Sequence, residues 1–255
     1  MDLRSTYLAF AMFGATLLGW RSFYGAGEFP SAGIACLLLL AILSLIGGYR
    51  IAVQRRRALL SAAIEPGSPV AGVLTGRLGA SFAAIAGTSA TVPITAYFAL
   101  TASDQEIYLA AAAAVWIIAV SLVIERLFWS HLRPRYRMSV VGPAALGLAA
   151  LPMLALVMAF SFWVLPVPAY AQTPVLAEAL SSALEGLPRH HPLAFEVLSV
   201  LRIADAFIYW LLAQDGFRAG LPVFLFLVKG AVIYLSIAKL AFDCRAAMMR
   251  SEEQA

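Results

Sequence analysis

Long apolar runs constrain this chain more than any other feature of its sequence. An α-helix needs roughly 20 apolar residues, at 1.5 Å per residue, to cross the hydrocarbon core of a membrane. Six runs approach that length: Ser5–Trp20, Ser31–Val53, Leu78–Ala102, Ile107–Ile124, Val140–Leu165 and Leu221–Phe242. They use up most of the 255 residues, so no large soluble domain remains. The runs predict an all-α integral membrane protein with about six transmembrane helices.

The composition agrees with this prediction. Charged residues make up 13% of the chain and hydrophobic residues 62%, whereas a soluble domain carries about 25% charged residues. The net charge of +4 does not indicate nucleic-acid binding, because the basic residues lie mostly beside apolar runs and no recognition motif accompanies them. We therefore expect the lipid bilayer as the main partner, and no nucleic acid.

The positions of the arginines predict the topology. One group flanks the loop between the second and third runs, and another lies between the fourth and fifth: Arg50, Arg55, Arg56, Arg57 and Arg77, then Arg126, Arg133, Arg135 and Arg137. Loops rich in Arg and Lys remain in the cytoplasm. The short acidic connection 103–106 then lies outside. The pattern predicts a multi-pass protein of the inner (plasma) membrane with both termini in the cytoplasm.

Three regions follow: a five-helix membrane region (1–165), an external segment (166–220), and a sixth membrane helix with a short cytoplasmic tail (221–255). Prolines between 166 and 174 end the fifth span, because proline cannot continue a helical hydrogen-bond ladder. Ala169-Tyr170-Ala171 has the form of a signal-cleavage site, but the apolar run before it is longer than a signal core. We favour a span that ends in a proline-rich turn.

Two helices are expected in the external segment, over Pro174–Leu184 and Pro192–Gln214. At 100° per residue the second gathers apolar side chains on one side, and Ser199, Arg202, Asp205 and Tyr209 on the other. We expect it to lie at the outer membrane interface or over the mouth of the bundle, with Arg202 and Asp205 contacting each other or water. A seventh span is the alternative, which its length allows.

Lys229 stands within the last apolar run, close to the expected middle of the membrane. A charge there costs about 2.5–3.5 kcal/mol, so the side chain should face the interior of the bundle. The nearest polar groups expected at that depth surround Pro93 in the third run: Thr88, Ser89, Thr91 and Thr95. These residues form a solute or ion site with Lys229, or else serve helix packing alone. Lys239 is expected to reach the cytoplasmic interface.

Other candidate groups give weaker signals. His190 and His191 are possible metal ligands, but adjacent histidines rarely bind one ion without help. The alternative is that they form a solvated turn. Glu125 and Arg126 should form an interfacial ion pair. Cys36 and Cys244 should lie toward opposite faces, too far apart for a disulfide. No catalytic triad, paired carboxylates, phosphate loop or cofactor motif is present, so we expect no cofactor and favour a non-enzymatic role.

Two hypotheses about function follow. The first is a transporter or channel for a small solute. The buried cation suggests that this solute is anionic. The third and sixth spans are interrupted, at Pro93 and at Lys229-Gly230, which is a weak indication of such a site. The second is a non-catalytic membrane subunit of a larger envelope complex, such as a secretion or respiratory assembly, or a homo-oligomer. A membrane-embedded enzyme comes third. A lone transporter should satisfy Lys229 within its own chain or by its ligand, whereas a subunit could pair it with a partner.

The topology is open to a direct test. Reporter fusions after Met138 and after Arg250 should report a cytoplasmic location, and a fusion after Gln172 an external one, because the arginine-rich loops stay inside. An external C-terminus would show that the helix over Pro192–Gln214 crosses the membrane.

Overall fold

The computed structural model describes residues 3–63, 77–128, 167–215 and 220–248, together with short pieces between 140 and 159. All regular structure in these ranges is helical, and they contain no strand. In chain order the elements are α1 (Leu3–Gly19), the π-helical turn η1 (Trp20–Tyr24), α2 (Pro30–Ala63), α4 (Arg77–Thr101), α5 (Asp104–Leu127), the 3₁₀ turn η3 (Ala169–Gln172), α7 (Leu176–Glu185), α8 (Pro192–Asp215) and α9 (Gly220–Met248).

Four helices are long and apolar enough to cross a membrane. They are α2 over Pro30–Arg57, α4 over Leu78–Thr101, α5 over Asp104–Leu127, and α9 over Gly220–Met248. These correspond to the second, third, fourth and sixth apolar runs. α1 matches the first run with 17 residues, and the expected fifth span, Val140–Leu165, lies largely outside the described residues. The all-helical membrane class is confirmed in the described part of the chain, and the count of six spans stays a prediction.

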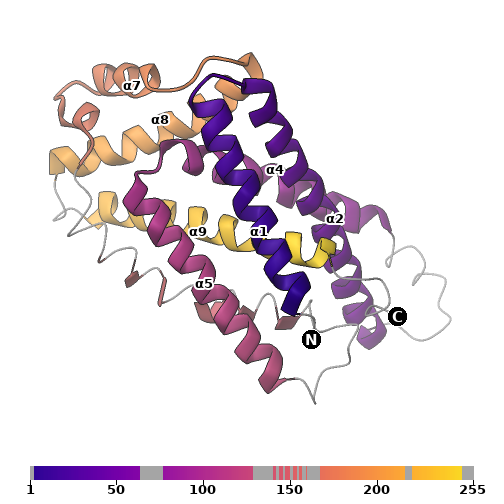
Figure 1. The fold of residues 1–255 in the computed structure, drawn as a ribbon. Helices are drawn as coiled ribbons and strands as arrows, with labels where there is room; N and C mark the ends of the chain where they lie inside the picture. The colour runs from indigo at the N-terminus through magenta and orange to yellow at the C-terminus, as the bar shows by residue number, and fades with distance from the viewer. Residues whose placement is uncertain are drawn as a thin grey trace.

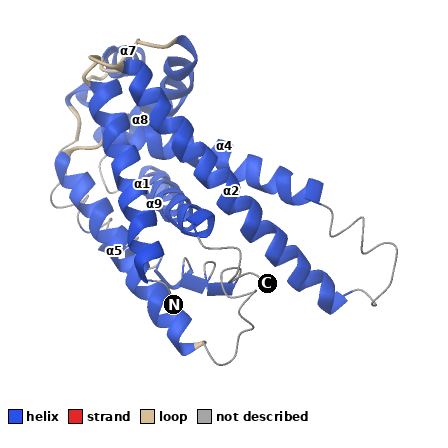
Figure 2. Cartoon of the chain, turned by 45° about the vertical axis from the view of Figure 1, so that its right-hand side comes forward, coloured by secondary structure: helices blue, strands red, loops and turns tan. Residues whose placement is uncertain are grey.

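The long helices form a bundle that is covered at one end. Figures 1 and 2 both show α7 and α8 lying across the end where α1 finishes and α2 begins. The end of α1 is tied there to the end of α4, because Trp20 Nε1 donates to the Ala96 carbonyl (3.0 Å) and Arg21 Nη1 to the Ala102 carbonyl (2.8 Å). Within the described ranges this end therefore carries the turns α1–α2 and α4–α5 beneath α7 and α8.

The sequence explains the helix ends at the α4–α5 turn. Ser103 and Glu106 form a reciprocal capping box, in which the Ser103 side chain accepts from the Glu106 amide and the Glu106 carboxylate accepts from the Ser103 amide. This satisfies amides that have no partner within the helix. α5 therefore begins at Asp104, three residues before the apolar run itself.

The centre of the bundle is apolar and is shared by four helices. Its buried members come from α1, α2, α4 and α9: Ala9, Phe13, Leu40, Phe98, Ala102, Ile233, Ile237, Leu240, Ala241 and Cys244. α9 stays buried up to its last turns, where Asp243, Cys244 and Arg245 are each 3% exposed or less. The sequence had suggested that these residues lie at or beyond the cytoplasmic end of the last span, and in the structure they are enclosed by the neighbouring helices.

α8 turns its polar face toward the protein. Leu198, Asp205 and Leu212 are buried, whereas Leu193 and Val200 are each 67% exposed. The amphipathic pattern over Pro192–Gln214 was predicted, and a position over the mouth of the bundle was one of the placements considered, beside the outer membrane interface and a seventh span. The pattern faces inward because the polar groups of α8 find their partners on α4 and α9, and the apolar side is left on the outside.

Glycine controls the contact between α2 and α9. A Cβ atom added at Gly47 would come within 1.8 Å of the Asp243 carbonyl oxygen, which is backbone and cannot move aside without shifting α9. A Cβ atom added at Gly14 in α1, in contrast, would have no neighbouring atom within 4 Å. The approach of α2 to α9 therefore requires glycine at 47.

We predict that Gly47→Ala destabilises the protein by roughly 1–3 kcal/mol, the usual range for overpacking. Thermal unfolding of the purified protein in lipid nanodiscs would measure the loss. Gly14→Ala is the matched control and should leave the stability nearly unchanged. Equal stability of the two variants would contradict the close α2–α9 contact.

Candidate functional site

Lys229 is paired within its own chain. Its ammonium forms an ion pair with the Asp205 carboxylate of α8, and its side chain is 17% exposed. The ammonium also lies 4.0 Å from the centre of the Tyr209 ring and 5.5 Å from that of Phe226. Lys229 therefore points into the protein, as predicted, and its charge is balanced by an acid and two aromatic faces.

Asp205 connects α8 to the bundle. The Tyr97 hydroxyl of α4 donates to its Oδ2 at 2.7 Å, and Arg202 Nη1 lies 3.6 Å from the same oxygen. The contact between Arg202 and Asp205 expected from their spacing is confirmed. Arg202 also donates from Nε to the Ala183 carbonyl (3.1 Å) and covers the Tyr170 ring at 4.7 Å, which ties α7 and η3 to the same centre.

These groups line a cavity of about 270 Å³ under α8, which we call the capped cavity. Four parts of the chain meet there: the α4–α5 turn, η3, α8 and α9. The polar lining residues are Tyr97, Thr101, Ser103, Glu106, Tyr170, Arg202, Asp205, Tyr209 and Lys229. With two cations and two carboxylates, the charges of this lining balance. A concave site with a few convergent polar groups is the usual form of a small-molecule site.

Two of the cavity's phenols lie outside the membrane-length helices, and both stay protonated. Burial raises the pKa of Tyr170 in η3, and burial also raises that of Tyr209 in α8, although the nearby Lys229 opposes the second shift. A phenol with a raised pKa keeps its proton at neutral pH and can donate a hydrogen bond. The cavity therefore offers hydroxyl donors together with charged groups.

The depth expected for Lys229 was wrong. Ser103 and Glu106, at the turn between two membrane-length helices, line the same cavity as Lys229. Lys229 therefore lies beside that turn rather than halfway along α4 and α5. The sequence alone could not show this, because the apolar run of α9 has no break at Lys229.

A second charged centre lies inside the bundle, and it contains Lys239 instead. Lys239 forms an ion pair with Asp243 one turn further along α9. Ser44 of α2 donates to Asp243 Oδ2 at 2.8 Å, and the Ser44 and Thr88 hydroxyls are 3.1 Å apart. We call Lys239 and Asp243 the central pair; Ser44 and Thr88 are its neighbouring hydroxyl residues. Lys239 was expected to extend to the cytoplasmic interface, but it bonds to Asp243.

The predicted hydroxyl residues of α4 do not surround Lys229. Thr88 joins the central pair, and Thr91 donates to the Gly87 carbonyl of its own helix (2.8 Å). Thr95 is fully buried, and its hydroxyl has no partner among the described residues, whereas Ser89 is exposed. α4 also continues through Pro93 without interruption. The sequence therefore identified a polar face of α4 but assigned it to the wrong lysine.

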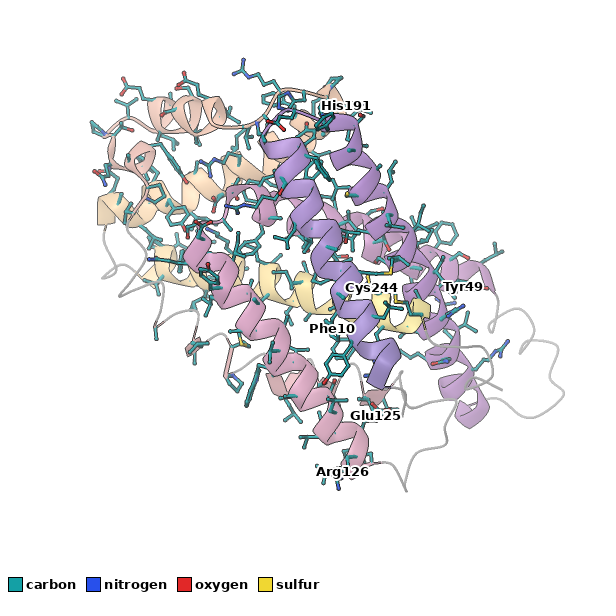
Figure 3. All side chains as sticks on the ribbon, in the orientation of Figure 1. Phe10, Tyr49, Glu125, Arg126, His191 and Cys244 are labelled. Atoms are coloured by element: carbon teal, nitrogen blue, oxygen red, sulfur yellow. The ribbon has the colours of Figure 1, made fainter. Side chains whose placement is uncertain are left out.

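The candidate metal ligands pack at the capped end. The His190 ring meets Tyr24 edge to face, with ring centres 5.5 Å apart, and Figure 3 places His191 near the α1–α2 turn. Among the residues that the structure describes, no group of three or more His, Cys, Asp or Glu could hold a metal ion. His190 thus joins the α7–α8 connection to the end of α1.

At the opposite end of the bundle, Glu125 has a different partner from the one expected. It accepts from Arg245 Nη2 of α9 at 2.8 Å, and both side chains are buried. Arg126 is exposed; Figure 3 shows both residues at the far end of α5. The expected Glu125–Arg126 pair was wrong, because neighbours in a helix point in different directions.

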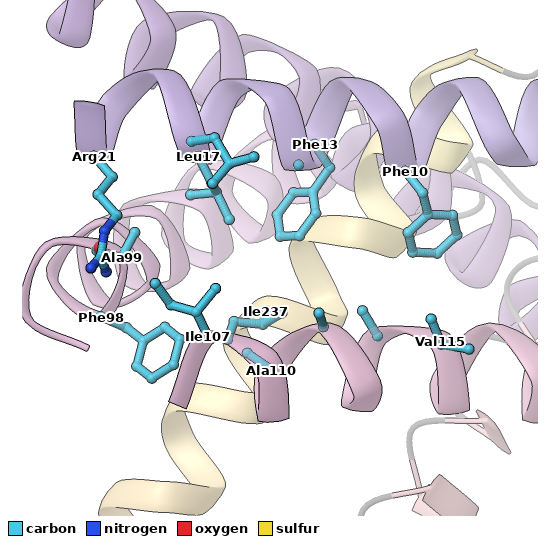
Figure 4. Close-up of a pocket in the computed structure, with 14 residues that line it drawn as sticks. Phe10, Phe13, Leu17, Arg21, Phe98, Ala99, Ile107, Ala110, Val115 and Ile237 are labelled. Carbon is cyan, nitrogen blue, oxygen red and sulfur yellow. The ribbon is translucent and has the colours of Figure 1, made fainter. Parts of the chain in front are cut away.

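An apolar groove of about 310 Å³ separates α1 from α5. Figure 4 shows Phe10, Phe13 and Leu17 on one side and Ala110 and Val115 on the other. Arg21 lies at one end, but its guanidinium already bonds to carbonyls of α4 and to Asp104. With this lining the groove suits hydrocarbon better than a polar solute, so the capped cavity is the stronger candidate site.

No protein-family model, curated protein or solved structure matches this chain. The functional argument therefore depends on the geometry of the capped cavity and of the central pair.

Sequence reasoning missed two acids that matter most. Asp205 was assigned to the polar side of an amphipathic helix, and Asp243, which directly follows the last apolar run, was given no role. A signal for the first was present: among the acids of the external segment, only Asp205 stands one helical turn from an arginine and a tyrosine, Arg202 and Tyr209. Such a cluster on one helix face is compatible with burial against a cation.

We predict unequal costs for removing the two members of the buried pair. Lys229→Met leaves Asp205 with Arg202 and Tyr97 as partners, whereas Asp205→Asn removes the acid that both Arg202 and Lys229 contact. Breaking a buried pair costs about 3–5 kcal/mol, so Asp205→Asn should be the more destabilising. The double variant should lose less than the sum of the single losses. Thermal unfolding in nanodiscs measures all three, and strictly additive losses would contradict the pair.

Proposed function

We propose that this chain is a multi-pass transporter or channel for a small polar solute, and that the capped cavity binds the solute. One observation carries the proposal: a cavity of about 270 Å³ lined by ionisable and hydroxyl groups lies at the capped end of the bundle. Charged groups inside membrane proteins are rare and usually mark solute or ion pathways. In this proposal α1 and the run 140–165 join the four membrane-length helices as six spans, with both termini in the cytoplasm of a cell with an inner membrane.

The pairing of Lys229 supports this function over an assembly role for that residue. A subunit that uses Lys229 to bind a partner would present it unpaired, but its charge is met by Asp205 of the same chain. The same pairing changes the proposed solute. An anionic solute was inferred from an uncompensated cation, and the cavity instead carries Arg202 and Lys229 with Asp205 and Glu106. We therefore propose a zwitterionic or neutral polar solute.

A non-catalytic subunit of an envelope complex is the second candidate, and the outer face of α8 favours it. Leu193, Val197, Val200, Ile203 and Phe207 are each at least 40% exposed on a helix that lies across the end of the bundle. Contiguous apolar surface outside the membrane core marks an interface with protein or lipid. This proposal requires a partner over α8, whereas transport by the single chain does not.

Uptake by the purified protein separates the two. Proteoliposomes would be shrunk in hyperosmotic glycine, glycerol or sodium lactate, and their re-swelling followed by light scattering. Glycine, a zwitterion, should enter fastest, because it can pair with both charges of the cavity. The charge-balanced double variant Asp205→Asn/Lys229→Met should slow entry at least about tenfold, which corresponds to about 1.4 kcal/mol.

Val115→Ala, on the exposed side of α5 and away from the capped cavity, is the control and should leave uptake unchanged. If none of the three solutes enters faster than into empty liposomes, the transport proposal is wrong and the subunit proposal stands.

A further inference from the structure

Asp243 holds a carboxylate near the middle of the membrane-length helices. Its partner Ser44 lies near the centre of Pro30–Arg57, and Thr88 near the centre of Leu78–Thr101. The Asp243 side chain is only 3% exposed. Bulk water therefore cannot solvate this charge, and its state depends on the groups that touch it.

The groups around Asp243 form a continuous set of exchangeable protons. Lys239 and the Ser44 hydroxyl both donate to its Oδ2, and the Ser44 hydroxyl is within hydrogen-bond distance of that of Thr88. A hydroxyl both donates and accepts, so a proton can be passed along such a chain. The capped cavity uses none of these four residues.

The neighbouring charges leave Asp243 and Lys239 as an isolated couple among the described residues. On α9 the nearby titratable groups are Cys244 and Arg245, and Arg245 pairs with Glu125 of α5. Arg50 of α2 donates to the carbonyls of Ala246 and Ala247. α4 contributes the Thr88 hydroxyl. A proton that reaches this centre therefore changes the charge of one couple only.

The two partners differ in their access to the surface. The Lys239 side chain is 33% exposed, against 3% for Asp243. Glycine makes room for the lysine, since a Cβ at Gly87 would meet its Nζ at 3.2 Å. Lys239 is thus the more accessible member of the pair, and the carboxyl group is the more enclosed one.

We propose that the central pair is a proton-binding site that couples the protein to a proton gradient. One proton from the aqueous phase binds the Asp243 carboxylate and gives the neutral acid. The ion pair then breaks, and Lys239 keeps its own proton as an ammonium. Release of the proton restores the pair. Coupling to solute movement rests on the function proposed above, whereas proton binding does not.

Infrared difference spectroscopy of the protein in nanodiscs tests proton binding without any solute. As pH falls, the exposed carboxylates of the chain also gain protons. The C=O band of the Asp243 acid, one per protein, should grow in addition to theirs and should shift in D₂O. The band should be absent from Asp243→Asn/Lys239→Met, which removes both charges together. Ser44→Ala, which keeps both charges, should move the midpoint to higher pH, because it removes a hydrogen bond to the ionised form.

The outcomes are separable. A band that is absent at every pH, or that ignores Ser44→Ala, overturns the proton site whatever the uptake assay shows. Coupling is tested by repeating the glycine uptake with an imposed pH gradient, which should change the rate at least twofold in the wild type. A gradient that has no effect on a working uptake overturns coupling alone. If no uptake exists, the failure belongs to the transport proposal, and the infrared titration still decides whether Asp243 binds a proton.

Discussion

A charge inside an apolar bundle must have a partner, and Asp205 provides it for Lys229. The effective penalty of desolvating each ion is several kcal/mol, and the pair offsets it only with further hydrogen bonds. Tyr97 supplies such a hydrogen bond from α4, and Arg202 adds a second ionic contact from α8 itself. The helices α7 and α8 and the turn η3 are thereby held over the end of the bundle, and the capped cavity exists because they are held there.

The same requirement explains the orientation of α8. An amphipathic helix in water would turn Arg202 and Asp205 outward, but here each group has a stronger partner inside. Its apolar side then faces away from the bundle, where lipid or another protein can cover it. The direction of an amphipathic face therefore depends on which surroundings hold the polar partners, and the periodicity of the sequence cannot decide this alone.

The positions of the helices along the sequence were predictable, whereas the placement of the helices relative to one another was not. Apolar run length gave α4 within one residue at each end, and helical periodicity gave α8 within one residue. The polar faces of α4 and α8 were also found correctly. What failed was depth: the apolar run of α9 gives no sign that Lys229 lies beside the α4–α5 turn. Lys229 was therefore assigned to the centre and Lys239 to the interface, whereas the contacts place Lys239 beside Ser44 and Thr88.

The spacing of the two lysines limits how the capped cavity and the central pair can influence each other. Ten residues along α9 correspond to about 15 Å. Two unit charges at that distance interact by about 1 kcal/mol at an effective dielectric constant of about 20. Moving a two-state equilibrium from mostly closed to mostly open needs about 5.5 kcal/mol. Direct electrostatics is therefore too weak, and coupling between the two centres has to pass through α9 itself. Because Lys229 and the whole Lys239–Asp243 pair stand on this one continuous helix, a shift of α9 that breaks the hydrogen bond from Ser44 of α2 to Asp243 also displaces Lys229 from Asp205 of α8.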